Sequence, residues 1–163
     1  MGLLDETTES RHEYFMREAL RLAEKAADIG EVPIGSVVVH GDRVVGRGYN
    51  QRETLQDATA HAEMIAISAA CQTLNSWRLD DCIIYVTLEP CTMCAGAIVL
   101  ARLKELVYAA SDPKGGACGT LYNIVEDERL NHKVETTSGV LAEQSAMILS
   151  GFFENIRANK NQG

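Results

Sequence analysis

The stretch IIYVTLEPCTMCAGAIVLAR, residues 83–102, carries a strand, a turn and a helix in immediate succession. Residues 83–88 are apolar and rich in β-branched side chains, which is typical of a buried strand. Pro90 is favoured in the first turn of a helix, and the helix that follows runs from Cys91 to about Arg102. A buried strand that leads directly into an apolar helix predicts an α/β architecture.

The rest of the chain continues this alternation of helices and strands. Ser10 and Glu13 form a capping box, which predicts a helix from there to about Ile29. The other expected elements are strands at 34–40, 43–49, 105–110 and 133–140, a polar loop at 50–58, a helix capped by Thr59 and a closing helix at 141–159. We therefore expect a three-layer α/β/α fold with a central five-stranded mixed sheet, as one domain over residues 1–163 with an ordered core at about 11–159.

Composition and charge exclude several classes of protein. The net charge of −8 argues against nonspecific binding of nucleic acid, which depends on Lys and Arg. The first residues lack the basic and apolar regions of an export signal, and the cysteine number is odd, so a disulfide framework is not expected. The longest apolar run, residues 93–101, is too short to span a membrane. The sequence predicts a cytoplasmic protein with reduced thiols and no membrane partner.

Three side chains have the types and spacing of metal ligands. Cys91 and Cys94 are three residues apart at the start of a helix, where two side chains can converge on one ion. The helix start favours the thiolate form that a metal needs. His61 begins its own helix, and the first turns of the two helices are expected to face one another above one edge of the sheet. Ligand softness favours zinc, with one Zn²⁺ ion per subunit.

The number of ligands indicates what kind of site this is. Structural zinc is closed by four protein ligands, whereas catalytic zinc keeps one position open for water. Here the motif offers three, and Glu63, two residues after His61, is placed beside the metal rather than on it. Zinc lowers the pKa of water to roughly 7, so Glu63 is the expected catalytic residue that takes a proton from this water. Alternatively, Cys91 and Cys94 are ordinary buried thiols or a redox pair, and His61 is a core histidine.

The chain resembles the tRNA adenosine deaminases of bacteria, the TadA family, within the cytidine deaminase superfamily. The resemblance covers Glu13 to about Arg157. It rests on the zinc signature H-x-E…P-C-x-x-C and on these matching stretches: EVPIGSVVV, TAHAE, WRL, YVTLEPCTMCAGA, Asp112-Pro113-Lys114, LNHKVE and Phe152-Phe153. Ala58 and Ala109 stand where the family commonly has Pro and Gly, and the C-terminal tail has fewer basic residues.

The resemblance implies hydrolytic deamination of adenosine to inosine at the wobble position of a tRNA anticodon, by a homodimer with the cytidine deaminase fold. It implies that Asn50 binds the target base, that Asn131 reads a neighbour in the anticodon loop, and that Phe153 and Arg157 contact this loop. From the residues alone, a turn residue is the favoured explanation of Asn50, capping of a turn is the alternative for Asn131, and one of Phe152 and Phe153 is expected in the core.

Two other functions stay open on the sequence. A deaminase of a free base or nucleoside, of the guanine or cytosine type, would use the same zinc chemistry without an anticodon-loop surface. A noncatalytic zinc-stabilised binding subunit would be supported by a fourth protein ligand on the metal, and the intact Glu63 argues against it. The apolar helix after Cys94 is expected to be buried, in part by a subunit interface.

Overall fold

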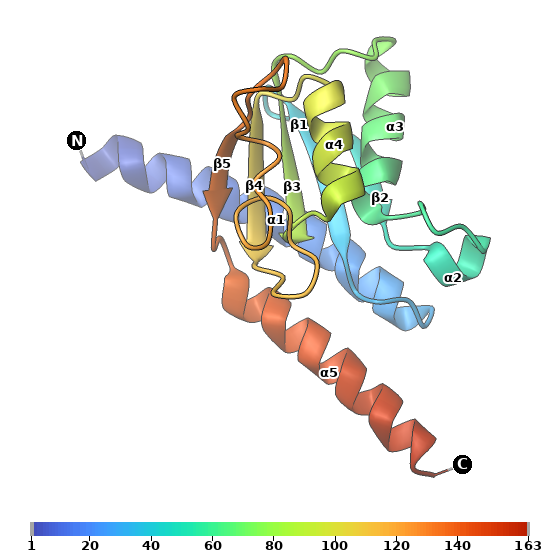
Figure 1. Ribbon diagram of the computed structural model, residues 1–163. Helices are drawn as coiled ribbons and strands as arrows, with labels where there is room; N and C mark the ends of the chain where they lie inside the picture. Colours follow the sequence, from blue (N-terminus) through green and yellow to red (C-terminus); the bar gives the residue numbers. More distant parts are fainter. Residues whose placement is uncertain (1, 163) are drawn as a thin grey trace.

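A five-stranded mixed sheet is the centre of the protein (Figure 1). The computed structural model describes the backbone of residues 2–162 and the side chains of residues 11–162. The strands lie in the order β2-β1-β3-β4-β5, with β1 antiparallel to its two neighbours and the pairs β3–β4 and β4–β5 parallel. Their bounds are β1 (Gly35–His40), β2 (Arg43–Tyr49), β3 (Cys82–Leu88), β4 (Glu105–Ala110) and β5 (Glu135–Ser138).

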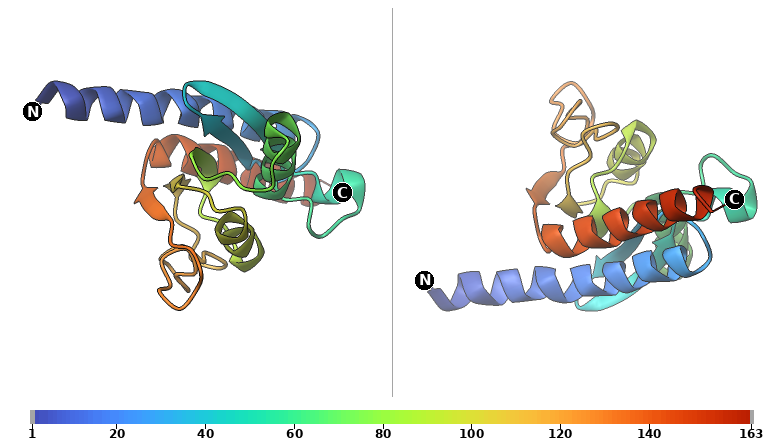
Figure 2. Two further views of the ribbon diagram at one scale, coloured as in Figure 1. Left: turned by 90° about the horizontal axis from the view of Figure 1, so that it is seen from above. Right: turned by 90° about the horizontal axis from the view of Figure 1, so that it is seen from below.

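Helices cover both faces of this sheet, which confirms the predicted three-layer fold (Figures 1 and 2). Helices α3 (Ala62–Leu74) and α4 (Thr92–Leu100) lie on one face. Helices α1 (Gly2–Asp28) and α5 (Ala142–Lys160) lie side by side on the other face (Figure 2, right). None of the helices within residues 2–162 is long and apolar enough to cross a membrane.

Alternating side chains of the strands supply the two halves of the core. Val38, Ile84 and Leu106 face α3 and α4, whereas their neighbours Val37, Tyr85 and Val107 face α1 and α5. The alternation follows from the two-residue period of a strand, in which successive side chains point to opposite faces. The sheet is therefore apolar on both sides, as the sequence of residues 83–88 predicted.

Two glycines of β2 allow α3 to approach the sheet closely. A Cβ atom at Gly46 would overlap the backbone oxygen of Ala66, and one at Gly48 would overlap that of Ala62. Any larger residue at either position would force the helix away from the strand. The first turn of α3, which carries His61 and Glu63, is thus fixed against the end of β2.

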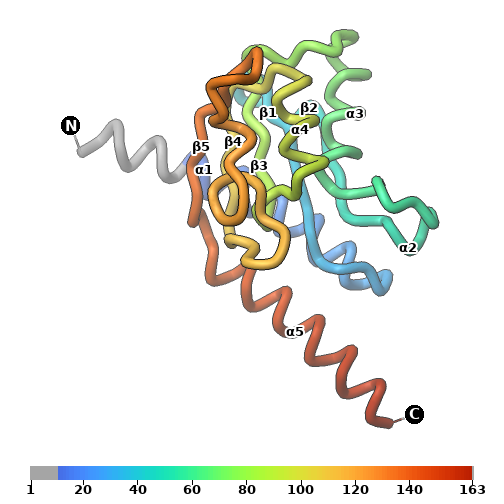
Figure 3. Tube along the Cα trace, in the orientation of Figure 1, coloured from blue at the N-terminus to red at the C-terminus, as the bar shows by residue number. Residues whose placement is uncertain are grey.

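The structure corrects some of the predicted local elements. The polar loop contains a short helix, α2 (Arg52–Leu55). The first helix begins at Gly2, before the predicted start at Ser10, whose side chain lies outside the described residues. The fifth strand is shorter than predicted, and the long connection that leads to it from β4 can be followed along the trace in Figure 3.

Burial is unusual for the residue type in two places. The polar His12 is only 9% exposed, because its ring lies between the Tyr85 hydroxyl and the Glu105 carboxylate. Helix α4 was expected to be buried, yet Leu100 is 70% exposed, although Cys94, Ala95, Ile98 and Val99 are buried. One side of this apolar helix is therefore uncovered in the single chain.

Candidate metal centre and active site

Helices α3 and α4 begin at the same edge of the sheet. Strands β2 and β3 run in the same direction, because each is antiparallel to β1, so their carboxyl ends meet at one edge. The segments that follow these two strands lead into α3 and α4. His61 is the N-cap residue of α3, and Cys91 is the N-cap residue of α4.

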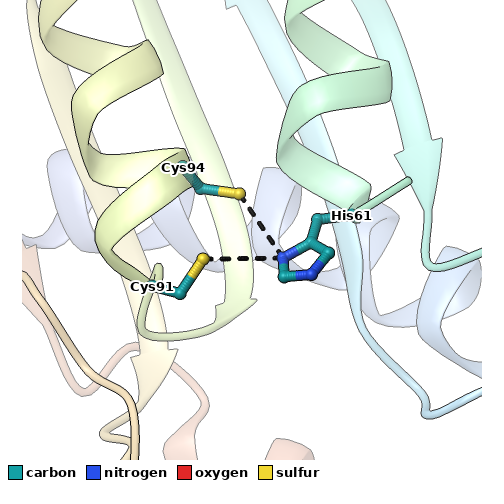
Figure 4. A group of neighbouring side chains, drawn as sticks. All are labelled: His61, Cys91 and Cys94. Carbon is teal, nitrogen blue, oxygen red and sulfur yellow. Dashed lines mark hydrogen bonds between the residues drawn. The ribbon is translucent and has the colours of Figure 1, made fainter. Parts of the chain in front are cut away.

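Neither N-cap side chain caps its own helix. Both residues have extended backbone angles and form no side-chain capping hydrogen bond. Thr59, which was predicted to cap α3, instead donates its hydroxyl hydrogen to Asp57. The His61 ring and the Cys91 thiol are consequently free to point at one another across the gap between the two helices (Figure 4).

His61, Cys91 and Cys94 form one group whose ligand atoms all lie within 4.8 Å of one another. The Nδ1 atom of His61 lies 3.6 Å from the sulfur of Cys91 and 3.6 Å from the sulfur of Cys94 (Figure 4). Tetrahedral bonds of about 2.3 Å to sulfur and about 2.0 Å to nitrogen would place such atoms about 3.5 Å apart. The separations therefore suit a tetrahedral ion with two sulfur ligands and one nitrogen ligand.

The protonation of the two thiols differs strongly. A hydrogen bond from the Cys94 thiol, together with one from the His61 ring, lowers the pKa of Cys91 to about 3 despite its burial. The same hydrogen bond to Cys91, together with burial, raises the pKa of Cys94. The hydrogen bond to Cys91 also raises the pKa of His61. These opposite shifts favour the thiolate at Cys91 and the thiol at Cys94 in the metal-free protein, so a metal would need to displace the proton of Cys94.

Glu63 lies in the first turn of α3 and is 4% exposed. Burial raises the pKa of its carboxyl group to about 7. A carboxyl group with a pKa near neutrality can both accept and release a proton under physiological conditions. Its place two residues after His61 puts this carboxyl group beside the three candidate ligands.

A small cavity of about 110 Å³ opens next to the His61 ring. Asn50 lines it and is 7% exposed. Its side-chain nitrogen donates to the Val32 carbonyl (3.3 Å), and its side-chain oxygen accepts from the Arg52 amide (3.1 Å). An asparagine amide has two donors and two acceptor positions, so one of each is still free for a ligand.

The other three predicted substrate-binding residues lie apart from this group. Asn131 is exposed in the connection between β4 and β5. Phe153 and Arg157 are exposed on α5, and Phe153 is 42% exposed. Phe152, its half-buried neighbour, packs edge-on against it with ring centroids 5.5 Å apart. Neither phenylalanine is fully buried, so the expectation that one belongs to the core is wrong.

Two buried carboxylates near the site were not singled out from the sequence. Glu31, 1% exposed, accepts hydrogen bonds from the backbone amides of Glu53 and Thr54 and so holds α2 in place. Burial opposes ionisation of Glu31, but these hydrogen bonds outweigh it and lower its pKa. Glu89, 2% exposed, holds the segment after β4. In the sequence, each of these two glutamates is visible only as an acidic residue next to an apolar strand. This pattern does not reveal which groups form hydrogen bonds with the carboxylate.

A family model described as MafB19-like deaminase matches residues 10–157. A curated tRNA-specific adenosine deaminase of Bacillus subtilis is 50% identical over 151 residues, which is 93% of this chain and 94% of the relative. The chain belongs to this deaminase family. The match includes the two helix starts that carry His61, Glu63, Cys91 and Cys94, because it spans nearly the whole chain.

Solved structures of deaminases have the same fold. A structure from a study of A-to-I editing by tRNA:A34 deaminases superposes with a TM-score of 0.80 and 45% identity, over 83% of this chain and 99% of the other. A guanine deaminase from Bacillus subtilis superposes with a TM-score of 0.59 and 44% identity, over 61% of this chain and 64% of the other. The tRNA deaminase is therefore matched over more of its length than the guanine deaminase.

Proposed function

We propose that this protein is a zinc-dependent hydrolytic deaminase that converts adenosine to inosine at the wobble position of a tRNA anticodon. The observation that carries the proposal is the 50% identity to a tRNA-specific adenosine deaminase over 93% of the chain. The group of His61, Cys91 and Cys94 beside the buried Glu63 supports the same reaction class. Zinc deaminases of nucleobases combine a His/Cys/Cys site with a glutamate that is not a ligand.

His61, Cys91 and Cys94 would hold one zinc ion in each subunit. When bound, the ion supplies a Lewis acid that lowers the pKa of water to roughly 7. The group contains three ligands within the part of the chain that the structure describes, which leaves a fourth position for water. This arrangement suits a catalytic site better than a closed structural one.

Glu63 carries the protons of the reaction. Water adds to carbon 6 of the adenine ring, and the Glu63 carboxylate takes the proton that this water loses and delivers it to ring nitrogen 1. Glu63 then takes the second proton, from the hydroxyl group now on carbon 6, and delivers it to the amine as the bond between carbon 6 and this amine breaks, so the products are inosine and ammonia. Burial keeps the pKa of Glu63 near 7, which suits a group that must act first as a base and then as an acid.

Substrate recognition would use groups that are free in the structure. Asn50 lines the cavity beside His61 and has one donor and one acceptor position left over, with which it would bind the flipped or unpaired adenine. Asn131, Phe153 and Arg157 are exposed and would contact the anticodon loop. A stacking aromatic ring and a guanidinium group are the side chains that single-stranded RNA loops commonly meet.

We further propose a homodimer in the cytoplasm, with residues 1–163 forming one deaminase domain. The apolar and partly uncovered α4 supports a subunit interface, because Leu100 is 70% exposed in the single chain. A second copy that covers this helix would remove its apolar side from water.

Deamination of a free base is the second candidate, and the similarity to a guanine deaminase favours it. To separate the two, the protein is incubated with an anticodon stem-loop and, separately, with free guanine, cytosine and adenosine. We expect inosine at the wobble position of the stem-loop and no turnover of the free compounds. Turnover of free guanine without reaction on the stem-loop would overturn the proposal.

A further inference from the structure

The Glu89 carboxylate is buried among hydrogen-bond donors that all come from one loop, the 112–120 loop. Its Oε1 atom accepts from the Asp112 amide (3.1 Å) and from the Thr120 hydroxyl. Its Oε2 atom accepts from the Cys118 amide (3.0 Å) and the Thr120 amide (3.1 Å). One side chain thereby accepts hydrogen bonds from three backbone amides, of which the Cys118 amide belongs to a buried residue.

This arrangement requires a carboxylate. Each oxygen of Glu89 accepts two hydrogen bonds, and each faces at least one backbone N–H group. A glutamine has only one acceptor atom, so its amide nitrogen would face a backbone N–H group in either orientation. Aspartate is too short by one methylene group to reach the same donors.

The same loop also holds the residues that lead into α4. The Pro90 carbonyl accepts from the Ala117 amide of the loop (2.9 Å), while the Glu89 amide donates to the Ala110 carbonyl at the end of β4 (2.8 Å). The two residues before Cys91 are thus attached to the loop, Glu89 through its side chain and Pro90 through its carbonyl. The 112–120 loop contributes no member to the candidate metal group, but it contacts both residues that directly precede the ligand Cys91.

Gly116, in the 112–120 loop, packs directly against the Glu89 carboxylate. A Cβ atom at this position would overlap the carboxyl group of Glu89. At the neighbouring Gly115, a Cβ atom would meet only the Asp112 side chain, at 3.4 Å. The close packing at Gly116 therefore serves the Glu89 carboxylate specifically.

We propose that Glu89 is a positioning residue of the metal centre: by binding the backbone of the 112–120 loop, it fixes the segment before α4 and places the Cys91 sulfur opposite His61. The inference rests on the proposed zinc site. Loss of a hydrogen-bonded group behind a metal ligand commonly weakens metal binding about 10- to 100-fold. The same loss is expected here, because Cys91 forms no capping hydrogen bond that could hold it independently.

The test is the affinity for zinc, measured by competition with a chelator on the full chain. Glu89→Gln perturbs the contact from the strand side, and Gly116→Ala perturbs it from the loop side. Matched controls are Glu105→Gln, which makes the same chemical change at the opposite end of the sheet, and Gly115→Ala. We expect both test variants to bind zinc about 10- to 100-fold more weakly and both controls to keep the wild-type affinity.

Two further readouts distinguish positioning from a general loss of stability. With cobalt at saturating concentration, the ligand-field spectrum of the two test variants should differ from wild type, because Cys91 is displaced. Amide exchange at Asp112, Cys118 and Thr120 should accelerate in Glu89→Gln even without metal.

Wild-type zinc affinity in both test variants would overturn the inference, as would an equal loss of affinity in the controls. Failure of the wild type to bind zinc would instead overturn the proposed function, while the exchange experiment would still report on the loop contact. Gly116→Ala keeps the test decisive if Glu89→Gln does not fold.

Discussion

Replacement of Glu63 by glutamine separates the chemistry of this site from its architecture. The side chain is 4% exposed in the first turn of α3, and glutamine has nearly the same shape. It cannot accept a proton from water or return one to the leaving amine. General acid–base catalysis commonly contributes 10²- to 10⁴-fold, so kcat should fall by about that factor, which corresponds to about 3 to 5 kcal/mol in the barrier.

The same variant should also differ from wild type in the pH dependence of its thermal stability. In the metal-free protein, burial raises the pKa of Glu63 to about 7. A carboxyl group whose pKa rises on folding stabilises the folded state at low pH, and this contribution is lost as the pH rises through the folded pKa. Glutamine is neutral at every pH, so metal-free Glu63→Gln should unfold at a temperature no lower than wild type above pH 7.

The assay combines three measurements on one preparation. Single-turnover deamination of an anticodon stem-loop gives the rate, metal analysis gives the zinc content, and thermal unfolding of metal-free protein gives the stability. We expect a rate loss of at least about 10²-fold with zinc content unchanged. A variant that deaminates near the wild-type rate would refute the role of Glu63, and one that loses its zinc would show that the residue supports the metal.

Three further predictions concern other parts of the molecule. Phe153→Ala and Arg157→Ala change exposed residues of α5, so they should weaken stem-loop binding while the unfolding temperature and zinc content stay at wild-type values. In a salt titration of stem-loop binding, Arg157→Ala should reduce the number of ions released by about one. Leu100→Asp should shift the protein from dimer to monomer in sedimentation experiments, since it charges the uncovered side of α4; an unchanged dimer would place the interface elsewhere. The hydrogen bond from His12 lowers the pKa of Glu105, and this shift stabilises the folded state at pH values above the ordinary carboxyl pKa of about 4.3. The difference in unfolding free energy between wild type and Glu105→Gln, measured by urea titration, should therefore shrink as the pH falls below that value.

Much of the fold could be predicted because strands and helices alternate with clear periodicity. β2 and β4 have the predicted bounds, whereas α4 begins at Thr92, so Pro90 precedes the N-cap residue Cys91 and does not lie in the first turn as predicted. The candidate metal group could be predicted because two cysteines three residues apart and a histidine that begins its own helix are a local pattern. The structure brings these residues together as expected.

What could not be predicted depends on contacts between distant residues. Helix α2 is held by the Glu31 carboxylate, 22 and 23 residues away, and a four-residue helix has no periodicity of its own. His12 is buried because Tyr85, 73 residues away, offers a hydroxyl group beneath α1. The Thr59 hydroxyl donates a hydrogen bond to Asp57 and therefore does not cap α3, whose N-cap residue is His61.

In the proposed reaction, water replaces the amine of one adenosine in an anticodon loop. The direct measurement is single-turnover reaction of zinc-loaded protein with a stem-loop in ¹⁸O-labelled water, followed by digestion to nucleosides and mass spectrometry. We predict one labelled oxygen in each inosine formed, with inosine at the wobble position and the other adenosines intact. Absence of inosine at this position, or inosine without the label, would contradict the proposed reaction.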